Sequence, residues 1–133
     1  MNGSCLCGAV QYEVASLDGP IEHCSCITCR KAHSAAFNTA AGVKLKNFKW
    51  VSGEGLLSTY ESSPGKRRRL CSICGSQLVA EYPGKPYVVL RVATLDEDPG
   101  KVAEFQIWKS QEAAWLVYDR DIPKYDEWEP GHA

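Results

Sequence analysis

Residues 71–75 read Cys71-Ser72-Ile73-Cys74-Gly75, and they are the most informative segment of the sequence. Two cysteines separated by two residues place both sulfurs on one turn, and the glycine that follows permits a backbone φ above zero. The amide N–H groups of such a turn remain available to bond the sulfurs and spread their negative charge. The stretch therefore predicts one half of a metal site that is built from thiolates.

Two further cysteine clusters precede this stretch, Cys5-Leu6-Cys7-Gly8 and Cys24-Ser25-Cys26-Ile27-Thr28-Cys29. Zinc takes four protein ligands in closed structural sites and keeps one position open in catalytic sites. The middle cluster offers three ligands within six residues. A fourth sulfur taken from another cluster would leave the second cysteine of that cluster without its partner. The economical division gives a closed structural zinc site of Cys5, Cys7, Cys71 and Cys74, and an open second site of Cys24, Cys26 and Cys29.

Two alternatives to this division stay open. A histidine could close the second site, and His33, four residues past Cys29, could reach it on a short helix. His23 adjoins Cys24, which strains chelation by both residues. A redox role for Cys71 and Cys74 is weaker, because no βαβ pattern surrounds them.

The pattern of apolar residues and turns predicts a mostly β fold with sheets packed on each other and short helical turns. Tyr87-Val88-Val89-Leu90 is continuous and apolar, as in a central strand that is buried on both faces. Short helices are expected at residues 27–33 and 111–116. Alternating or apolar segments predict the strands, namely residues 9–14, 48–51, 56–60, 77–81 and 87–92.

Length and composition argue against some classes of function. The 133 residues fit one domain, residues 1–133, and the net charge of −1 gives no electrostatic case for nucleic acid. No apolar run approaches the roughly 18 residues of a spanning helix, so no membrane is expected. The chain opens without a secretory pattern, and seven cysteines are an odd number. Both features favour the reducing cytoplasm, where closely grouped thiols are metal ligands more often than disulfides.

The three clusters, in this order, resemble the glutathione-dependent formaldehyde-activating enzyme family, which includes relatives of centromere protein V. The resemblance continues through Trp50-Val51-Ser52-Gly53-Glu54, and further matching residues carry it to the C-terminal part of the chain. These are Tyr60, Ser62-Ser63-Pro64, Leu95-Asp96, Trp115, Asp119 and Pro123.

The resemblance implies the Mss4-like fold, in which β-sheets pack around a structural zinc. It also implies that the first and third clusters are structural and that the middle cluster is catalytic. The family's activity is the addition of glutathione to formaldehyde, which gives S-(hydroxymethyl)glutathione. In reverse the reaction cleaves a carbon–sulfur bond, so the enzyme is a carbon–sulfur lyase. The alternative function is a non-catalytic, zinc-stabilised binding module of the same fold.

This chain departs from the family pattern in two places. The middle cluster of the family often reads Cys-His-Cys, whereas Ser25 separates the two cysteines here. Relatives often carry a histidine before an Ile-aromatic pair, whereas this chain has Gln106 before Ile107-Trp108. It is also shorter than the enzyme after which the family is named.

Charge predicts how the open site works. Three thiolates on Zn²⁺ leave a charge of −1, and such a centre suits an incoming thiol that is held as a reactive thiolate. The partners are then a small thiol such as glutathione and a small aldehyde. A fourth thiolate needs nearby cations, which Arg30 and Lys31 are expected to supply, and His33 is a candidate proton shuttle. Two zinc ions are expected, with partial occupancy at the second site.

The basic run Lys66-Arg67-Arg68-Arg69 predicts a solvated strand or turn. The alternative is a functional role, in which the run binds the carboxylates of a glutathione-like ligand. An arginine guanidinium suits this role because it can donate two parallel hydrogen bonds to one carboxylate. Because the run leads into Cys71, it is expected to lie beside the structural site rather than the open one.

Overall fold

Strands dominate the computed structural model of the chain, which describes residues 1–117 and 121–131. The mostly β prediction is confirmed, and helices are few and short. Asp119 and His132 lie outside the described residues. The strands are β1 (Asn2–Ser4), β2 (Gln11–Val14), β3 (Ile21–Cys24), β4 (Asn38–Lys44), β5 (Phe48–Ser52), β6 (Leu57–Ser63), β7 (Lys66–Cys71), β8 (Gln77–Glu81), β9 (Tyr87–Arg91) and β10 (Ala103–Ile107). The helical elements are α1 (Ile27–His33) and the 3-10 turns η1 (Leu45–Asn47), η2 (Glu54–Leu56), η3 (Val92–Thr94) and η4 (Lys109–Gln111).

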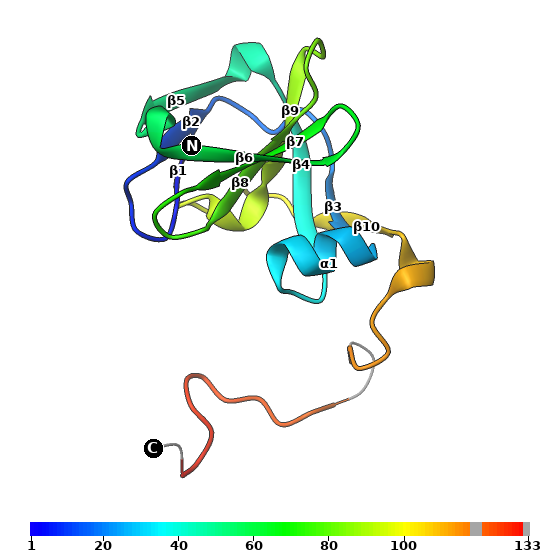
Figure 1. Cartoon of the computed structure of the whole chain (residues 1–133). Coiled ribbons are helices and arrows are strands. Elements are labelled where there is room, and N and C mark those ends of the chain that lie inside the picture. The colour runs from blue at the N-terminus through cyan, green and yellow to red at the C-terminus, as the bar shows by residue number, and fades with distance from the viewer. Residues whose placement is uncertain (118–120, 132–133) are drawn as a thin grey trace.

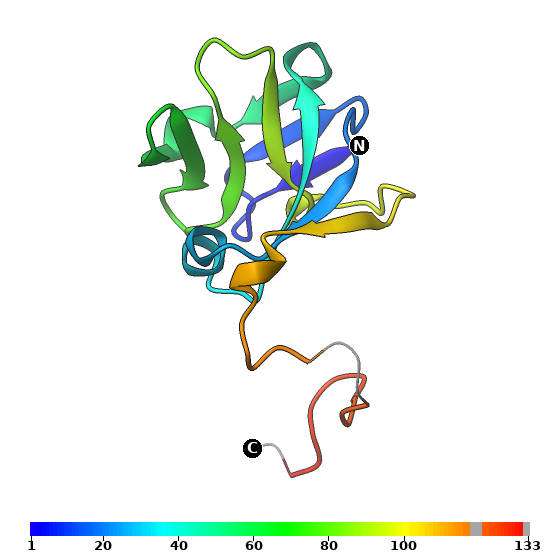
Figure 2. The ribbon, with the colours of Figure 1, turned by 90° about the vertical axis from the view of Figure 1, so that its right-hand side faces the viewer.

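The strands form two sheets. The smaller sheet has the order β1-β2-β5, and the larger has the order β10-β3-β4-β9-β8-β7-β6 (Figure 2). All neighbouring strands pair antiparallel except β10 and β3, which run parallel. The predicted central strand is confirmed, because β9 lies between β4 and β8.

The hydrophobic core lies between the sheets. Alternation along β2 buries Tyr12 and Val14 from the small sheet, and Val79 and Leu90 face them from the large sheet. Each fully buried side chain of this size stabilises the fold by roughly 1.5–3 kcal/mol. Cys5 and Cys71 belong to the same core cluster, so one group of thiols is anchored in the most stable part of the fold.

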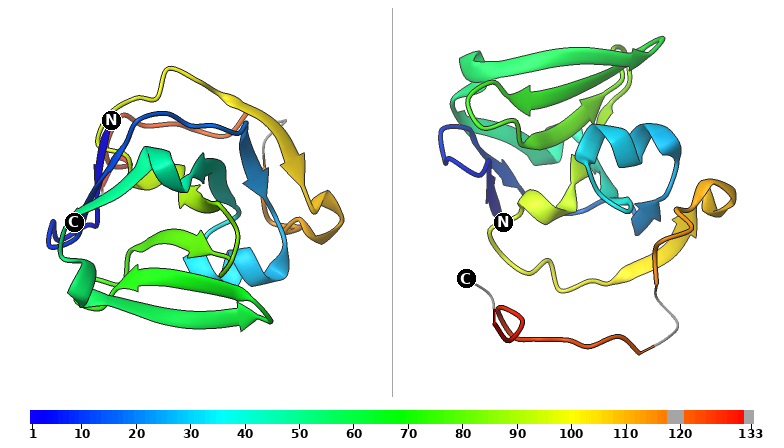
Figure 3. Two further views of the ribbon diagram at one scale, coloured as in Figure 1. Left: turned by 90° about the horizontal axis from the view of Figure 1, so that it is seen from above. Right: turned by 60° about the horizontal axis from the view of Figure 1, so that its bottom comes forward.

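The short helix α1 follows β3 directly and lies at one end of the large sheet, close to β10 (Figures 1 and 3). The predicted helix at residues 27–33 is therefore confirmed. The predicted helix at 111–116 is wrong, because the 3-10 turn η4 ends at Gln111 and the backbone of Glu112 is non-helical, with ψ 139°. Within the described residues, no helix has the length and apolar character that a bilayer crossing requires.

Candidate metal centres and the pocket beside them

The four thiols of Cys5, Cys7, Cys71 and Cys74 converge on one point, with all sulfurs within 4.8 Å of one another. The Sγ atoms of Cys5 and Cys7 are 3.6 Å apart, and those of Cys7 and Cys71 are 3.9 Å apart. A tetrahedron with Zn–S bonds of about 2.3 Å places its sulfurs about 3.8 Å apart. The group therefore has the size and the donors of a closed zinc site, and all its cysteines are free of disulfides.

Local backbone geometry explains why these thiols point inward. Gly8 and Gly75 have φ values of 78° and 79°, as the position after each cysteine pair predicts. The amide of Val10 donates to the sulfur of Cys5 at 3.3 Å, and the hydroxyl of Ser76 lies 3.3 Å from the sulfur of Cys74. These polar contacts spread the negative charge of metal-bound thiolates and hold each sulfur in place.

The thiols of Cys24, Cys26 and Cys29 form a second group, again within 4.8 Å of one another. Cys24 ends β3, Cys26 is the N-cap of α1, and Cys29 lies on the buried face of that helix. The amide of Cys29 donates to the Cys26 sulfur at 3.2 Å, so the helix start itself fixes the spacing. The sulfurs thus gather into the groups of four and three that the spacing predicts, and each group could hold a metal ion.

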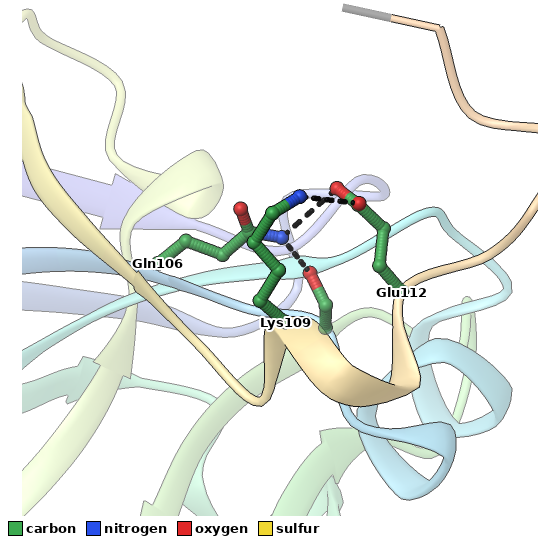
Figure 4. A network of polar contacts seen from close by, with 4 residues as sticks. Gln106, Lys109 and Glu112 are labelled. Atoms are coloured by element: carbon green, nitrogen blue, oxygen red, sulfur yellow. Dashed lines mark hydrogen bonds and ion pairs between the residues drawn. The ribbon is translucent and has the colours of Figure 1, made fainter.

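Residues of the edge strand β10 and of the turn that follows it hold the loop that carries these three thiols. Ser25 is fully buried, its amide donates to the carbonyl of Ile107 at 3.1 Å, and its hydroxyl accepts from the Gln106 side-chain amide at 2.7 Å. Gln106 also donates to Glu112 at 3.1 Å, and Lys109 pairs with the other oxygen of that carboxylate at 2.8 Å (Figure 4). The loop is therefore fixed by β10 and η4 rather than by neighbours in sequence.

Neither histidine near the middle cluster joins the three-thiol group. The imidazole of His23 lies 2.9 Å from the Thr39 hydroxyl and packs against Phe37, so its side chain is engaged elsewhere. Burial, together with the positive charges of Arg91 and Arg68, lowers the pKa of His33 to about 4. His33 is thus neutral at pH 7, and its role as a proton shuttle stays a prediction.

Arg68 is the cation that contacts the middle cluster. Its side chain is only 2% exposed, its Nε donates to the Ser62 hydroxyl at 2.9 Å, and its Nη2 donates to the Cys29 sulfur at 3.8 Å. The prediction that the run at residues 66–69 is solvated is wrong for Arg68, and so is its expected place beside the four-thiol group. Arg68 turns inward while Arg67 stays exposed and Arg69 pairs with Glu81, because a register shift between Arg69 and Leu70 interrupts the regular alternation that runs back from buried Cys71.

The pKa values of Cys24 and Cys29 are shifted in opposite directions. Burial and the negative charge of Cys29 raise the pKa of Cys24 to about 12. Burial would also raise the pKa of Cys29, yet hydrogen bonds from Cys26 and Arg68 outweigh it and lower the pKa below its ordinary value. Negative charge in the metal-free cluster therefore gathers at Cys29, beside Arg68.

Cys26 is half-buried and opens onto a pocket of about 260 Å³. Lys66 and Arg68 line this pocket with positive charge, and Trp108 also lines it. A second pocket of about 540 Å³ shares Thr28, Ser62 and Arg68 with the first, and Lys31 lines it. Arg30 lines neither pocket, and its Nε has no partner among the described residues.

Comparison with known proteins agrees with this geometry. The model of the glutathione-dependent formaldehyde-activating enzyme family matches residues 1–111. A crystal structure of a Rhodobacter sphaeroides protein from a structural genomics programme is 28% identical in sequence. The similarity covers 80% of this chain and 98% of that chain, with a TM-score of 0.65. Both clusters of thiols and the clamp at Gln106 lie within the residues that the family model matches.

Proposed function

The chain belongs to the glutathione-dependent formaldehyde-activating enzyme family, and from this premise we propose that it is a zinc-dependent carbon–sulfur lyase. Its substrates are adducts of glutathione, or of a similar small thiol, with formaldehyde or another small aldehyde. In the synthetic direction it forms an S-(hydroxymethyl)glutathione-like product. The whole chain, residues 1–133, acts as one zinc-binding domain in the cytoplasm, where its seven unpaired thiols stay reduced.

The observation that carries the proposal is the contrast between the two thiol groups. Four thiols gather at the edge of the core in the number that a closed zinc site needs, whereas three thiols lie where Cys26 meets a basic pocket. A site with three protein ligands and an adjoining pocket is the arrangement of a catalytic zinc. The four-thiol group is then the structural zinc site, and Cys24, Cys26 and Cys29 form the reactive one.

The residues around the pocket fit a thiol that carries carboxylates. Zinc, when bound by the three thiols, would supply a Lewis acid that keeps a coordinating thiol deprotonated at neutral pH. Lys66 and Arg68 place positive charge where a glutathione-like ligand presents its carboxylates. Lys31, in the adjoining pocket, extends this positive surface.

The bond changes are simple and need no further reactant. The thiol loses its proton, its sulfur attacks the aldehyde carbon, and a carbon–sulfur bond forms. The carbonyl π electrons move to oxygen, which takes up a proton, so thiol and aldehyde together give the hydroxyalkyl thioether. The lyase direction reverses each step, and neither direction oxidises or reduces the substrate.

Calorimetric titration of glutathione into the zinc-loaded protein tests the site. We expect Cys26→Ser to abolish glutathione binding and to leave the circular dichroism spectrum unchanged, because Cys26 is half-buried and lies outside the core cluster. Thr28→Ala is the matched control, since it lines the same pocket without offering a thiol. Glutathione binding that survives in Cys26→Ser would contradict the proposed site.

Exchange spectroscopy by NMR then tests turnover. The rate of exchange between free aldehyde and its glutathione adduct is compared with and without the protein, over a panel of small aldehydes. Acceleration that Cys26→Ser loses supports the lyase. Glutathione binding without acceleration for any aldehyde would instead favour the non-catalytic binding module.

A further inference from the structure

Two arginines are buried beside the three-thiol group. Arg68 of β7 is 2% exposed and Arg91 of β9 is 4% exposed, and β8 separates their strands. Within residues 1–117 and 121–131, no carboxylate forms an ion pair with either guanidinium. The same fold thus holds two internal cations without the partners that buried arginines usually have.

Arg68 contacts the thiols directly, and Arg91 interacts with them through charge alone. Arg68 donates to the Cys29 sulfur, while its Nη1 has no partner among the described residues. The Nε and Nη2 of Arg91 are likewise buried without a partner there. The negative charges of Cys29, Tyr82 and Cys24 favour the charged form of Arg91, whereas burial and Arg68 oppose it and lower its pKa to about 10. Arg91 therefore stays positive at neutral pH.

The energetic cost of this arrangement is high unless negative charge lies nearby. Burying an uncompensated charge costs several kcal/mol, and two like charges in one region add repulsion. The thiols of Cys24 and Cys29 are buried acidic groups within electrostatic reach of Arg91, and the half-buried Tyr82 is a further acidic group within that reach. Three thiolates and one divalent cation carry a combined charge of −1, so the loaded cluster supplies lasting negative charge beside the two arginines.

We propose that Arg68 and Arg91 are positioning residues that counterbalance the thiolates of Cys24, Cys26 and Cys29. Through this charge balance they raise the affinity of the three-thiol site for its divalent cation. The inference rests on the proposed second metal site, but it does not depend on aldehyde turnover. Groups that contact metal-ligating residues from outside typically change metal affinity by about 10- to 100-fold when they are removed.

Competition between the protein and a colorimetric chelator for Zn²⁺ tests the inference, with no substrate present. We expect the wild-type protein to hold two equivalents of Zn²⁺ with separable affinities. Arg68→Met should weaken the site with the lower affinity by about 10- to 100-fold, while Arg68→Lys, which keeps the charge, should stay within about fivefold of the wild type. The four-thiol site serves as an internal control whose affinity should not move in either variant.

Arg69→Met is the matched control, because Arg69 is the next residue of β7 and faces Glu81 instead of the thiols. Cobalt substitution adds a spectroscopic readout, since the thiolate-to-cobalt absorption of the three-thiol site should vanish first in Arg68→Met. The same comparison of methionine and lysine at Arg91 is an independent second test if Arg68→Met does not fold.

The outcomes separate this inference from the proposed function. Two zinc equivalents with unchanged affinity in Arg68→Met would overturn the charge balance and leave the lyase standing. A wild-type protein that binds only one equivalent would overturn both. Selective loss of the weaker site in the methionine variants supports the charge balance, whether or not any aldehyde is turned over.

Discussion

The side-chain amide of Gln106 donates a hydrogen bond of 2.7 Å to the buried hydroxyl of Ser25, across 81 residues of sequence. At both positions, the resemblance to the family leads us to expect a histidine instead. In the fold they are partners, so the serine between the cysteines and the glutamine of β10 form one matched pair. The pair fixes the loop that carries Cys24 and Cys26.

Gln106→Ala should therefore disturb the three-thiol site specifically. The change leaves the Ser25 hydroxyl buried without its donor, which costs about 1–3 kcal/mol, and it frees the loop that positions two thiols. We expect the free energy of unfolding to fall by that amount and zinc affinity at this site to fall about tenfold. Urea denaturation and chelator competition measure the two effects.

Lys109→Met is the control for this change. Lys109 pairs with the same Glu112 carboxylate, but its side chain is 71% exposed, so the ion pair contributes less than about 1 kcal/mol. Equal losses of zinc affinity in both variants would show that the Gln106 contact has no special role.

Stepwise removal of metal should expose the difference between the two thiol groups. The four-thiol group includes Cys5 and Cys71 of the hydrophobic core, so its loss should unfold the protein. The three-thiol group should release its zinc at lower chelator concentration while circular dichroism stays native. Cys71→Ser should lower the free energy of unfolding by at least about 3 kcal/mol, and Cys26→Ser by less than about 1 kcal/mol. Unfolding that accompanies release of the first zinc equivalent would contradict this order.

His33 should make the protein sensitive to mild acid. Its pKa is about 4 in the fold and 6.5 when unperturbed, so protons bind the unfolded state more readily. Its contribution to stability is complete above pH 6.5 and is lost as the pH falls from 6.5 to 4, by up to roughly 3 kcal/mol.

His33→Gln should flatten this part of the pH–stability curve. Thermal unfolding at pH 7, 6, 5 and 4, with zinc in excess, compares the variant with the wild type, because thiol protonation affects both proteins alike. Parallel curves for the two proteins would show that His33 does not titrate with a depressed pKa.

Gly53 should tolerate no side chain. Its φ is 74°, and an added Cβ would collide with the carbonyl of Ala9, so the backbone segment before β2 and the segment after β5 would have to separate. We expect Gly53→Ala to destabilise the fold by about 2–4 kcal/mol. Gly55→Ala, two residues on, has open space and no positive φ, and it should change stability by less than about 1 kcal/mol. Thermal denaturation of the two variants checks the contrast.

Strands with a clear local sequence pattern were predicted correctly. The segment at residues 77–81 matches β8, and the apolar run from Tyr87 matches β9, because burial on both faces leaves a continuous apolar sequence. β3 was not predicted, because its four residues lack a regular alternation of apolar and polar residues. β10 was not predicted either, although Ala103–Ile107 alternates apolar and polar residues as a half-buried strand should. Their parallel pairing joins segments about 80 residues apart, which no local pattern encodes.

The thiol groups followed from ligand number, since seven sulfurs divide economically in one way. The role of Arg68 did not follow, because the regular period of a strand points to a different residue. Counting back two residues at a time from buried Cys71 reaches Arg69, and only the register shift in the pairing of β7 with β8, between Arg69 and Leu70, turns Arg68 inward instead. Such irregularities depend on the neighbouring strand, so they appear only once the sheet is assembled.

The parallel pairing of β10 with β3 also dictates the order in which the two thiol groups can mature during synthesis. The four-thiol group and its Ser76 contact are complete once residue 76 has emerged from the ribosome. The loop at residues 24–29 must wait for Gln106, Ile107 and Gln111, which bind Ser25 and Ile27. A nascent chain can therefore assemble its four-thiol group well before the loop of the three-thiol group is fixed. The synthesis of β10, the last strand, determines when Cys24, Cys26 and Cys29 reach their final positions.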